Sequence, residues 1–292
     1  MKVKKKEAII DILGGFGNQL FQLSFANYLR GSGFKVYINL HNFRRVIDKK
    51  NSIITNRELI LPLDYFKFDE IKSNNFLKYD LIDKLKLNNL NLFISNKLIK
   101  HYFSWFNDKN LDLENASKFN RFTGYWQTLK ILEHNKDFLI EGLSKNAEIA
   151  GGLNSAPEEG STALHVRRTD YLDMGEELND DYYKASLEYA KNNINNFSYE
   201  IFTDDEDWVK SNKIFKNATK INSFENNKEN TILAFSSMLK NENFIISNST
   251  FSLLASFLKE TSKSIIIYPD PWFKKQERNN LAKSSWIPIK NN

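Results

Sequence analysis

The sequence contains no cysteine, so the chain forms neither disulfide bonds nor thiolate metal sites, which agrees with a reducing compartment. Proline (5) and glycine (11) are scarce among 292 residues, and this excludes collagen-like and long linker segments. The four histidines are scattered and show none of the spacings typical of zinc enzymes. No apolar run approaches the ~20 residues that a transmembrane helix needs. These absences favour a cytoplasmic globular protein without a metal site.

The charge is mildly positive, with a net value of +5 and a pI near 9.0. Such a balance suits an anionic small molecule, an anionic membrane surface or weak nucleic-acid contact. No stripe of Lys and Arg with interleaved aromatics is present, so no nucleic-acid partner is expected. The lysines within Met1–Lys6 form either a solvated tail or a peripheral contact on the inner membrane face. The apolar stretch after them is too interrupted to be a signal peptide.

The first half begins with a βαβ pattern. A strand is expected over Glu7–Leu13, a helix over Leu20–Arg30 and a second strand over Lys35–Asn39. The glycine turn between the first strand and the helix does not fit a dinucleotide site, because the third glycine of that motif would fall on Leu20. The turn presents Asn18 at a helix N-terminus, which favours anions and polar ligand groups. A turn shaped only for packing is the alternative.

The middle of the chain is less informative. Residues 40–120 contain an apolar patch over residues 85–93 that suits a core. Arg121–Gln127 is predicted to be a strand that runs into a turn, whose aromatic residues either line a sugar cleft or simply pack. Gly151–Gly160 is rich in turn formers, so we place a boundary there, between a first domain over residues 1–150 and a second over residues 151–292.

The second half is organised around the run from His165 to Tyr171, which follows a short predicted strand. Alternation along that strand would direct Leu164 and Val166 to one face and His165 and Arg167 to the other. The planar guanidinium group of an arginine is a fork of N–H donors, and such forks at the carboxyl end of a parallel strand can bind a phosphate or carboxylate. Asp170 could hold one of these forks in place or carry out proton chemistry. A surface run with an internal salt bridge is the alternative.

Two further strand ends carry polar residues. Thr203–Trp208 follows the predicted strand Tyr199–Phe202, and Thr203 or Asp204 is expected to cap the next helix; a carboxylate metal site is the alternative. Asn248–Ser252 follows another strand and opens a helix that runs to Lys259. Amide hydrogens and small hydroxyls at a helix start can cradle a phosphate, although serine and threonine are also ordinary N-caps.

Several separated segments match one pattern in order and resemble the α-1,2-fucosyltransferases of glycosyltransferase family 11, especially the bacterial members that decorate surface polysaccharides. The run from His165 to Tyr171 is shared with α-1,6-fucosyltransferases, and the glycine turn together with the start of the last helix narrows the resemblance to family 11. The segments are Gly14–Gln22, Gly124–Gln127, His165–Tyr171, Phe202–Trp208 and Ile246–Ser252.

The resemblance implies an α/β fold of GT-B type, with two Rossmann-like domains facing across a cleft. The first domain, with a helical insert, would lie on the acceptor side, and the second would bind the GDP-sugar. The expected reaction is inverting transfer of L-fucose from GDP-L-fucose to the 2-hydroxyl of a galactose-containing oligosaccharide or lipid-linked acceptor, with neither metal nor cofactor. Transfer of a related sugar such as colitose, and a non-catalytic glycan- or nucleotide-binding module, are the alternatives.

Roles follow from the resemblance residue by residue. Arg167 and Arg168 would hold the pyrophosphate with His165 beside it, and Asp204 or Asp205 would lie near the nucleoside. Ser249, Thr250 and Phe251 would form the helix start that caps the phosphates. The glycine turn, with Gly15, Gly17 and Asn18, would face the reacting sugar; Asp170 and Asn18 are the candidates for the catalytic base. Leu253 and Leu254 stand where family members often carry paired tryptophans, which leaves guanine contacts and acceptor choice open.

Overall fold

A computed structural model of the chain describes residues 7–40, 43, 57–71, 121–224, 227–274 and 281–291. The chain forms two compact units, Met1–Gly14 with Asn18–Leu139, and Gly15–Gly17 with Ile140–Asn292. The division therefore falls at residues 139–140, before the boundary expected at residue 150. The expected linker is helical at its start, because helix α8 (Ala147–Asn154) includes its first residues. Asn146 caps this helix, with its side chain accepting from the backbone N–H of Ile149 at 3.1 Å.

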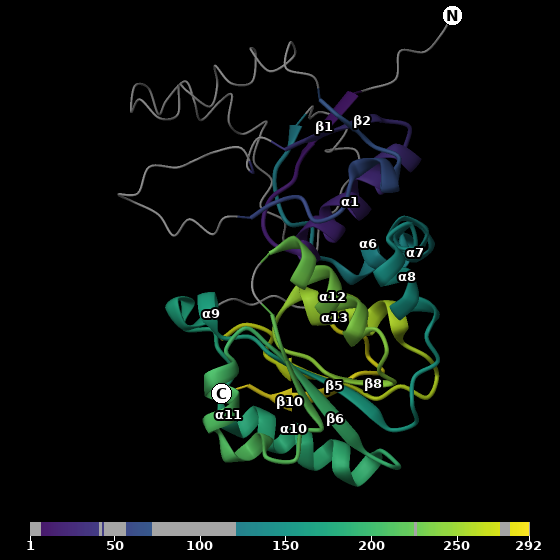
Figure 1. The fold of residues 1–292 in the computed structure, drawn as a ribbon. Helices are drawn as coiled ribbons and strands as arrows, with labels where there is room; N and C mark the ends of the chain where they lie inside the picture. Colours follow the sequence, from purple (N-terminus) through teal and green to yellow (C-terminus); the bar gives the residue numbers. More distant parts are fainter. Residues whose placement is uncertain are drawn as a thin grey trace, which may run out of the picture. The chain divides into compact units, whose positions relative to one another are not determined.

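The N-terminal unit is built on a four-stranded parallel sheet with the order β3-β2-β1-β4. Its strands are β1 (Glu7–Asp11), β2 (Lys35–Asn39), β3 (Asp69–Glu70) and β4 (Arg121–Phe122). Helix α1 (Phe16–Gly31) connects β1 to β2, as the βαβ pattern predicts (Figure 1). It begins four residues before the expected start at Leu20, since Phe16 is already buried at its first turn. The apolar patch expected over residues 85–93 lies outside the described residues.

Short helices complete the part of this unit that the structure describes. They are η1 (Leu63–Phe66), α6 (Leu129–His134) and the start of α7 (Lys136–Leu143). The core combines buried aliphatic and aromatic side chains from the strands, from α1 and from the segment after β4; Ile10, Leu20, Phe25 and Trp126 are among them. The rings of Phe25 and Trp126 stack with their centroids 4.0 Å apart, which holds the segment after β4 against α1.

The C-terminal unit is built on a six-stranded parallel sheet with the order β10-β9-β8-β5-β6-β7. Strand β6 (Ser198–Thr203) extends the expected range by one residue at each end, and β5 (Ser161–Val166) and β8 (Asn243–Ile245) are the strands expected before the arginine run and before Asn248. Strand β9 (Ile266–Asp270) pairs with β8. Strands β7 (Lys220–Ser223) and β10 (Ile287–Lys290), at the two edges, were not expected. The predicted α/β class, with two Rossmann-like parallel sheets, is confirmed.

Helices cover both faces of this sheet (Figure 1). Helices α10 (Asp180–Asn193) and α11 (Glu206–Ser211) lie on one face, and α12 (Lys228–Met238) and α13 (Thr250–Lys259) lie on the other. Leu164 and Val166 point into the core beneath α10, together with Tyr182. His165 points to the opposite face, where its ring meets α13. The alternation predicted along β5 is therefore observed.

Lys259, at the end of α13, fixes the end of α8. Its ammonium donates to the backbone carbonyls of Gly152, Leu153 and Ser155 at 3.2, 2.8 and 2.7 Å. These are carbonyls at a helix C-terminus, where a positive charge is favourable. Burial lowers the pKa of Lys259.

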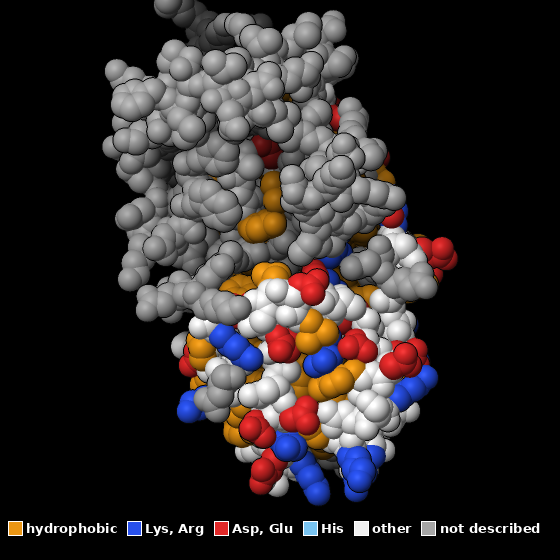
Figure 2. Space-filling model, turned by 90° about the vertical axis from the view of Figure 1, so that its left-hand side faces the viewer, with side chains coloured by type: hydrophobic (Ala, Val, Ile, Leu, Met, Phe, Trp, Pro, Cys, Tyr) orange, Lys and Arg blue, Asp and Glu red, His pale blue; other side chains and the backbone are white. Residues whose placement is uncertain are grey.

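The described surface carries charges of both signs. On the face shown in Figure 2, basic and acidic side chains are interspersed over the coloured part of the molecule. No positive stripe of the kind that follows a nucleic-acid backbone is visible on the coloured part of that face. Among the helices that the structure describes, none is long and apolar enough to cross a membrane.

Candidate active site

The candidate site lies at the C-terminal ends of β5 and β8, where the strand order of the C-terminal sheet reverses. From β5 the chain proceeds outward through β6 to β7, then returns to the other side of β5 as β8. In open parallel sheets, ligands bind outside the carboxyl ends of the strands at such a switch point. Arg167 and Arg168 follow β5 directly, and the loop after β8 leads through Ser247 to α13. The topology thus gathers two segments that the sequence singled out.

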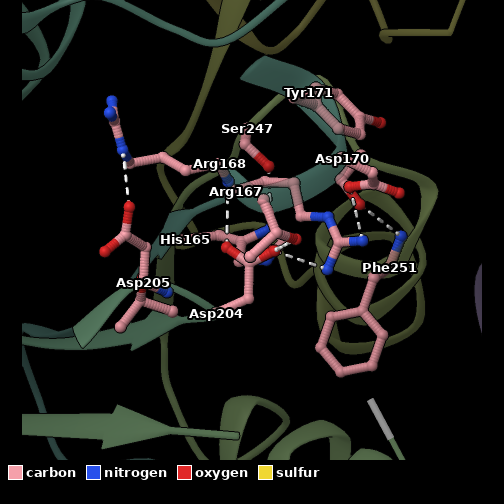
Figure 3. Close-up of polar contacts among 12 residues, drawn as sticks. His165, Arg167, Arg168, Asp170, Tyr171, Asp204, Asp205, Ser247 and Phe251 are labelled. Carbon is pink, nitrogen blue, oxygen red and sulfur yellow. Dashed lines mark hydrogen bonds and ion pairs between the residues drawn. The ribbon is translucent and has the colours of Figure 1, made fainter. Parts of the chain in front are cut away.

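Arg167 is held by two carboxylates (Figure 3). Its Nη2 lies 2.7 Å from Oδ1 of Asp170, and its Nη1 lies 2.8 Å from Oδ2 of Asp204. Its guanidinium carbon is also 5.8 Å from the centroid of the Tyr171 ring. The Arg167 side chain is only 10% exposed; of its two partners, Asp204 is buried and Asp170 is partly exposed. This fixed fork can act as a preorganised anion site.

Arg168 is held in a different way. Its Nε–H donates to Oδ2 of Asp205 at 3.0 Å, and its guanidinium carbon lies 4.0 Å from the centroid of the Trp208 ring. Figure 3 shows the two Nη groups pointing away from Asp205. Stacking on an indole uses the flat face of the guanidinium and leaves the edge that carries the Nη groups for hydrogen bonding.

Asp204 and Asp205 both hold the arginine run in place. Besides the ion pair with Arg167, Asp204 accepts the backbone N–H of Arg168 at 2.9 Å. Asp205 caps α11 by accepting the backbone N–H of Trp208 at 3.1 Å. The expectation that Thr203 or Asp204 would cap this helix is therefore wrong. The hydroxyl of Thr203 instead accepts the N–H of Asp205 at 3.0 Å, which turns the chain one residue further before the helix begins.

The salt bridges that were the alternative explanation of this run are therefore present. They do not exclude anion binding, because each guanidinium has more N–H donors than these contacts use. Arg167 engages two carboxylates through one contact at each Nη, and Arg168 engages one through Nε. The carboxylates thus fix the orientation of both forks while leaving part of each for a ligand.

His165 is a buried, neutral ring between the arginine run and α13. Its Nδ1 lies 2.8 Å from the hydroxyl of Ser247 and 2.9 Å from that of Ser252. The ring lies against Phe251, with centroids 5.8 Å apart. Burial, reinforced by the charge of Arg167, lowers the pKa of His165 to about 3, against a weaker opposing effect of Asp204. The ring is thus uncharged at neutral pH and joins β5 to the loop before α13 through Ser247 and to the first turn of α13 through Ser252.

The start of α13 is a polar segment at the carboxyl end of β8. Ser249 is the N-cap, with its hydroxyl accepting the backbone N–H of Phe251 at 3.4 Å. The carbonyl of Asn248 accepts the hydroxyl of Tyr171 at 3.0 Å, so this loop is tied to helix α9 (Thr169–Met174). Thr250 and Phe251 are the first helical residues. Thr250 is partly exposed, while Ser249 is nearly buried.

The remaining candidates belong to the glycine turn after β1. Gly15 is partly exposed within the turn and Gly17 is buried in the first turn of α1. The side chain of Asn18 accepts a hydrogen bond from Nε2 of Gln127 at 2.8 Å. Gln19 fastens the turn, donating to the carbonyls of Gly14 at 3.1 Å and of Glu58 at 2.8 Å.

The described residues contain no cluster of three or more histidine and acidic side chains that could hold a metal ion. Asp204 and Asp205, the pair considered as a metal site, use their carboxylates on the two arginines and on backbone amides.

Sequence reasoning missed several residues that contact the candidate residues of the two units. Trp208 beneath Arg168 was noted only as the end of a motif, and Ser247 and Ser252 only as parts of a strand and a helix. Gln127 was noted only as the end of an aromatic turn. Each makes its contact with a residue far away in the chain. The one local signal was the short polar cluster at each strand end.

Comparison with known proteins finds similarity along most of the chain. The model of glycosyl transferase family 11 matches residues 12–290. An alpha-1,2-colitosyltransferase of Escherichia coli is 30% identical over 188 residues, which cover 58% of this chain and 62% of that protein. The chain thus spans less than two thirds of that relative. The O-antigen biosynthesis glycosyltransferase WbnK of Escherichia coli is 24% identical over 303 residues, 94% of this chain and 98% of that protein.

Two solved structures are also similar. The fucosyltransferase NodZ from Bradyrhizobium is 13% identical with a TM-score of 0.44, and the match covers 87% of this chain and 93% of NodZ. A variant of Arabidopsis thaliana FUT1 in complex with GDP is 12% identical with a TM-score of 0.44, and the match covers 91% of this chain and 70% of FUT1.

Proposed function

Because the chain belongs to glycosyltransferase family 11, we propose that it transfers L-fucose from GDP-L-fucose to the 2-hydroxyl of a galactose-like acceptor, with inversion at the anomeric carbon. The acceptor would be an oligosaccharide or a lipid-linked sugar of a surface polysaccharide such as an O-antigen, reached in the cytoplasm or at the inner membrane face. The observation that carries this proposal is the pair of fixed arginine forks beside a helix N-terminus, at the switch point of the C-terminal sheet.

The proposed chemistry places the GDP leaving group on these residues. The oxygen of the acceptor's 2-hydroxyl bonds to the anomeric carbon and gives its proton to a general base, while the bond from that carbon to the phosphate oxygen breaks and negative charge grows on the pyrophosphate. Arg167 and Arg168 would bind that charge, and the backbone amides at the start of α13, with Ser249 and Thr250, would bind the remaining phosphate oxygens. Fixed donors of this kind need no reorganisation during the reaction, so we propose that transfer needs neither a divalent cation nor another cofactor.

The carboxylates near the arginines would act through them. Asp170 and Asp204 grip Arg167, and Asp205 grips Arg168, so all three would set the direction of the forks. This role adds to the expectation that Asp204 or Asp205 would lie near the nucleoside. His165 would hold the loop before α13 at a fixed distance from β5 through its bonds to Ser247 and Ser252. Asn18, in the other unit, would contact the acceptor.

A second candidate donor is a GDP-linked colitose. The relative with 30% identity is named a colitosyltransferase, and this supports colitose as the transferred sugar. Fucose and colitose donors would share the same nucleoside diphosphate, so the arginine site serves both equally.

A donor screen tests the proposal. Purified protein is incubated with GDP-fucose, GDP-colitose, GDP-mannose and UDP-galactose, each with galactosyl acceptors and each alone to detect hydrolysis. Turnover of a GDP-6-deoxysugar is the expected result. The enzyme's preference for GDP-fucose or GDP-colitose then decides between the two donors. Turnover of UDP-galactose alone would overturn the proposal, and binding of GDP without any turnover would favour the non-catalytic module.

A further inference from the structure

The described sheet of the N-terminal unit has its own switch point, between β1 and β4. The chain leaves β1 for β2 and β3 on one side, and β4 then pairs with the other side of β1. The turn after β1 leads to Asn18, and the turn after β4 leads to Gln127. The two side chains meet, with Nε2–H of Gln127 donating to Oδ1 of Asn18 at 2.8 Å.

We propose that Gln127 is a positioning residue that fixes the side-chain amide of Asn18 for acceptor binding. This inference rests on the proposed function, because it concerns the residue assigned there to the acceptor. Gln127 itself acts through Asn18 and needs no contact with the sugar.

The orientation of the Asn18 amide is set at its oxygen end. An asparagine amide has an acceptor oxygen and a donor nitrogen, and turning it over exchanges them. The bond from Gln127 fixes the oxygen end. The nitrogen end lies over Gly14, where a Cβ atom would come within 2.8 Å of Nδ2. Gly14 has a φ of +80°, so the backbone favours glycine there, and the absence of a side chain leaves room for the Asn18 amide.

Gln127 is itself held between two fixed neighbours. Trp126, before it, has a φ of 56°, a left-handed conformation that is uncommon for a bulky residue. Such strain persists where the surroundings enforce it, and here the buried indole is stacked on Phe25. Thr128, after it, donates its N–H to the carbonyl of Trp126 at 3.0 Å and caps α6. The backbone conformation of Trp126 therefore sets the direction in which the side chain of Gln127 extends from the backbone.

The two turns stay joined without Gln127. Gln22 of α1 accepts the backbone N–H of Leu13 at 3.0 Å and donates to the carbonyl of Gly124 at 2.9 Å. One side chain thus connects the turn after β1 to the turn after β4. Removal of the Gln127 amide should leave this connection and the fold intact, so the contact with Asn18 is better explained by the placement of Asn18 than by folding.

The test uses two substitutions of similar size. Gln127→Met removes the donor. Gln127→Glu replaces it with a carboxylate that only accepts, so the Asn18 amide must turn over to meet it. Each is made alone and together with Asn18→Ala, and kcat and KM are measured for donor and acceptor. The matched control is Asn27→Ala, which removes an amide–amide bond of 2.6 Å between the same helix α1 and Asn135.

Misplacement of a substrate-binding group can cost up to about 100-fold in rate. We expect kcat/KM for the acceptor to fall on that order in both Gln127 variants and more in Gln127→Glu, with GDP affinity unchanged. In the Asn18→Ala background the same substitutions should have no further effect, because a residue that acts through Asn18 is silent without it. Asn27→Ala should leave kcat/KM unchanged. Equal losses with and without Asn18 would overturn the proposal.

A second readout does not depend on turnover. In protein labelled with ¹⁵N at asparagine, the side-chain amide signal of Asn18 is identified by its loss in Asn18→Ala. That signal should shift in Gln127→Met and not in Asn27→Ala, and an unchanged signal in Gln127→Met would overturn the proposal. If no donor sugar is turned over but the signal shifts, the proposed function fails while the control of Asn18 by Gln127 stands.

Discussion

The guanidinium of Arg168 lies on the indole ring of Trp208, 4.0 Å from its centroid, while its Nε–H is bound by Asp205. A lysine at position 168 would keep the charge and lose both the flat stacking surface and the fork. Arg167, gripped by two carboxylates, presents the same difference. Both arginines therefore act through their shape as well as their charge.

We predict that Arg167→Lys and Arg168→Lys each lower kcat by about 100- to 1000-fold, the loss typical for removal of one fixed donor to a developing negative charge. KM for the GDP-sugar should change less, because the interaction strengthens as the leaving group departs. Steady-state kinetics measure both constants, with circular dichroism to check folding. Lys184→Arg, at an exposed position, is the control. A near-normal kcat in both lysine variants would show that the arginines only form salt bridges and do not take part in the reaction.

Stability should depend on pH through His165. The pKa of this residue is about 3 in the folded protein, against about 6.5 for an ordinary histidine in the unfolded chain. Between these values only the unfolded chain takes up the proton, so His165 stabilises the fold above pH 6.5 and loses that contribution as the pH falls. Relative to His165→Asn, the wild type should lose about 2 kcal/mol of unfolding free energy from about pH 7.5 to about pH 5. Urea unfolding of both proteins at each pH measures the free energy of unfolding. Parallel pH profiles of the two proteins would contradict the prediction.

Ser249→Ala should weaken GDP binding less than either arginine substitution does. Its hydroxyl makes one long capping bond to Phe251, and the backbone amides at the start of α13 remain after the substitution. A neutral hydrogen bond contributes about 0.5–1.5 kcal/mol, so affinity should fall by roughly tenfold at most. Thr250→Val should behave in the same way. Calorimetric titration with GDP measures the affinity. Complete loss of GDP binding in a folded variant would show that the hydroxyl, and not the backbone amides, binds the phosphate.

Activity should survive exhaustive treatment with EDTA. The arginines and the start of α13 supply the positive charge, and the carboxylates of Asp204 and Asp205 are already bound to arginine. The assay compares treated enzyme, untreated enzyme and treated enzyme with Mn²⁺ or Mg²⁺ added back. Loss of activity that either ion restores would show that one of these carboxylates leaves its arginine to bind metal.

The elements that sequence predicted well are those defined by local rules. Strand β2 has the predicted bounds, and α13 ends at the predicted Lys259. The alternation along β5 placed His165 and Leu164 on the correct faces, because a strand alternates its side chains whatever its neighbours are. The polar clusters at strand ends were also recognisable, since parallel strands share one carboxyl edge.

The parts that sequence missed depend on strand order and on contacts between distant segments. The edge strands β7 and β10 are short and partly exposed, so their alternation carries little signal. The N-cap of α11 fell on Asp205 because the carboxylate of Asp204, its equal as a cap, is taken by the two arginine residues. The sequence shows Trp208 and Gln127, but it does not show which distant residues they contact, because those contacts depend on how the strands of each sheet are arranged.

The stacking of Trp208 on Arg168 also gives the protein an optical signal at its candidate donor site. Indole emission responds to a cation held against the ring, and a ligand that draws the guanidinium toward itself changes that contact. Trp126, in the other unit, is buried against Phe25 and reports on the segment that carries Gln127. The sequence has five tryptophans, so the emission of each of these two indoles is obtained as the difference between the wild type and the variant in which that tryptophan is replaced with phenylalanine. Donor and acceptor occupancy could then be followed in real time, in unlabelled protein, from its own fluorescence.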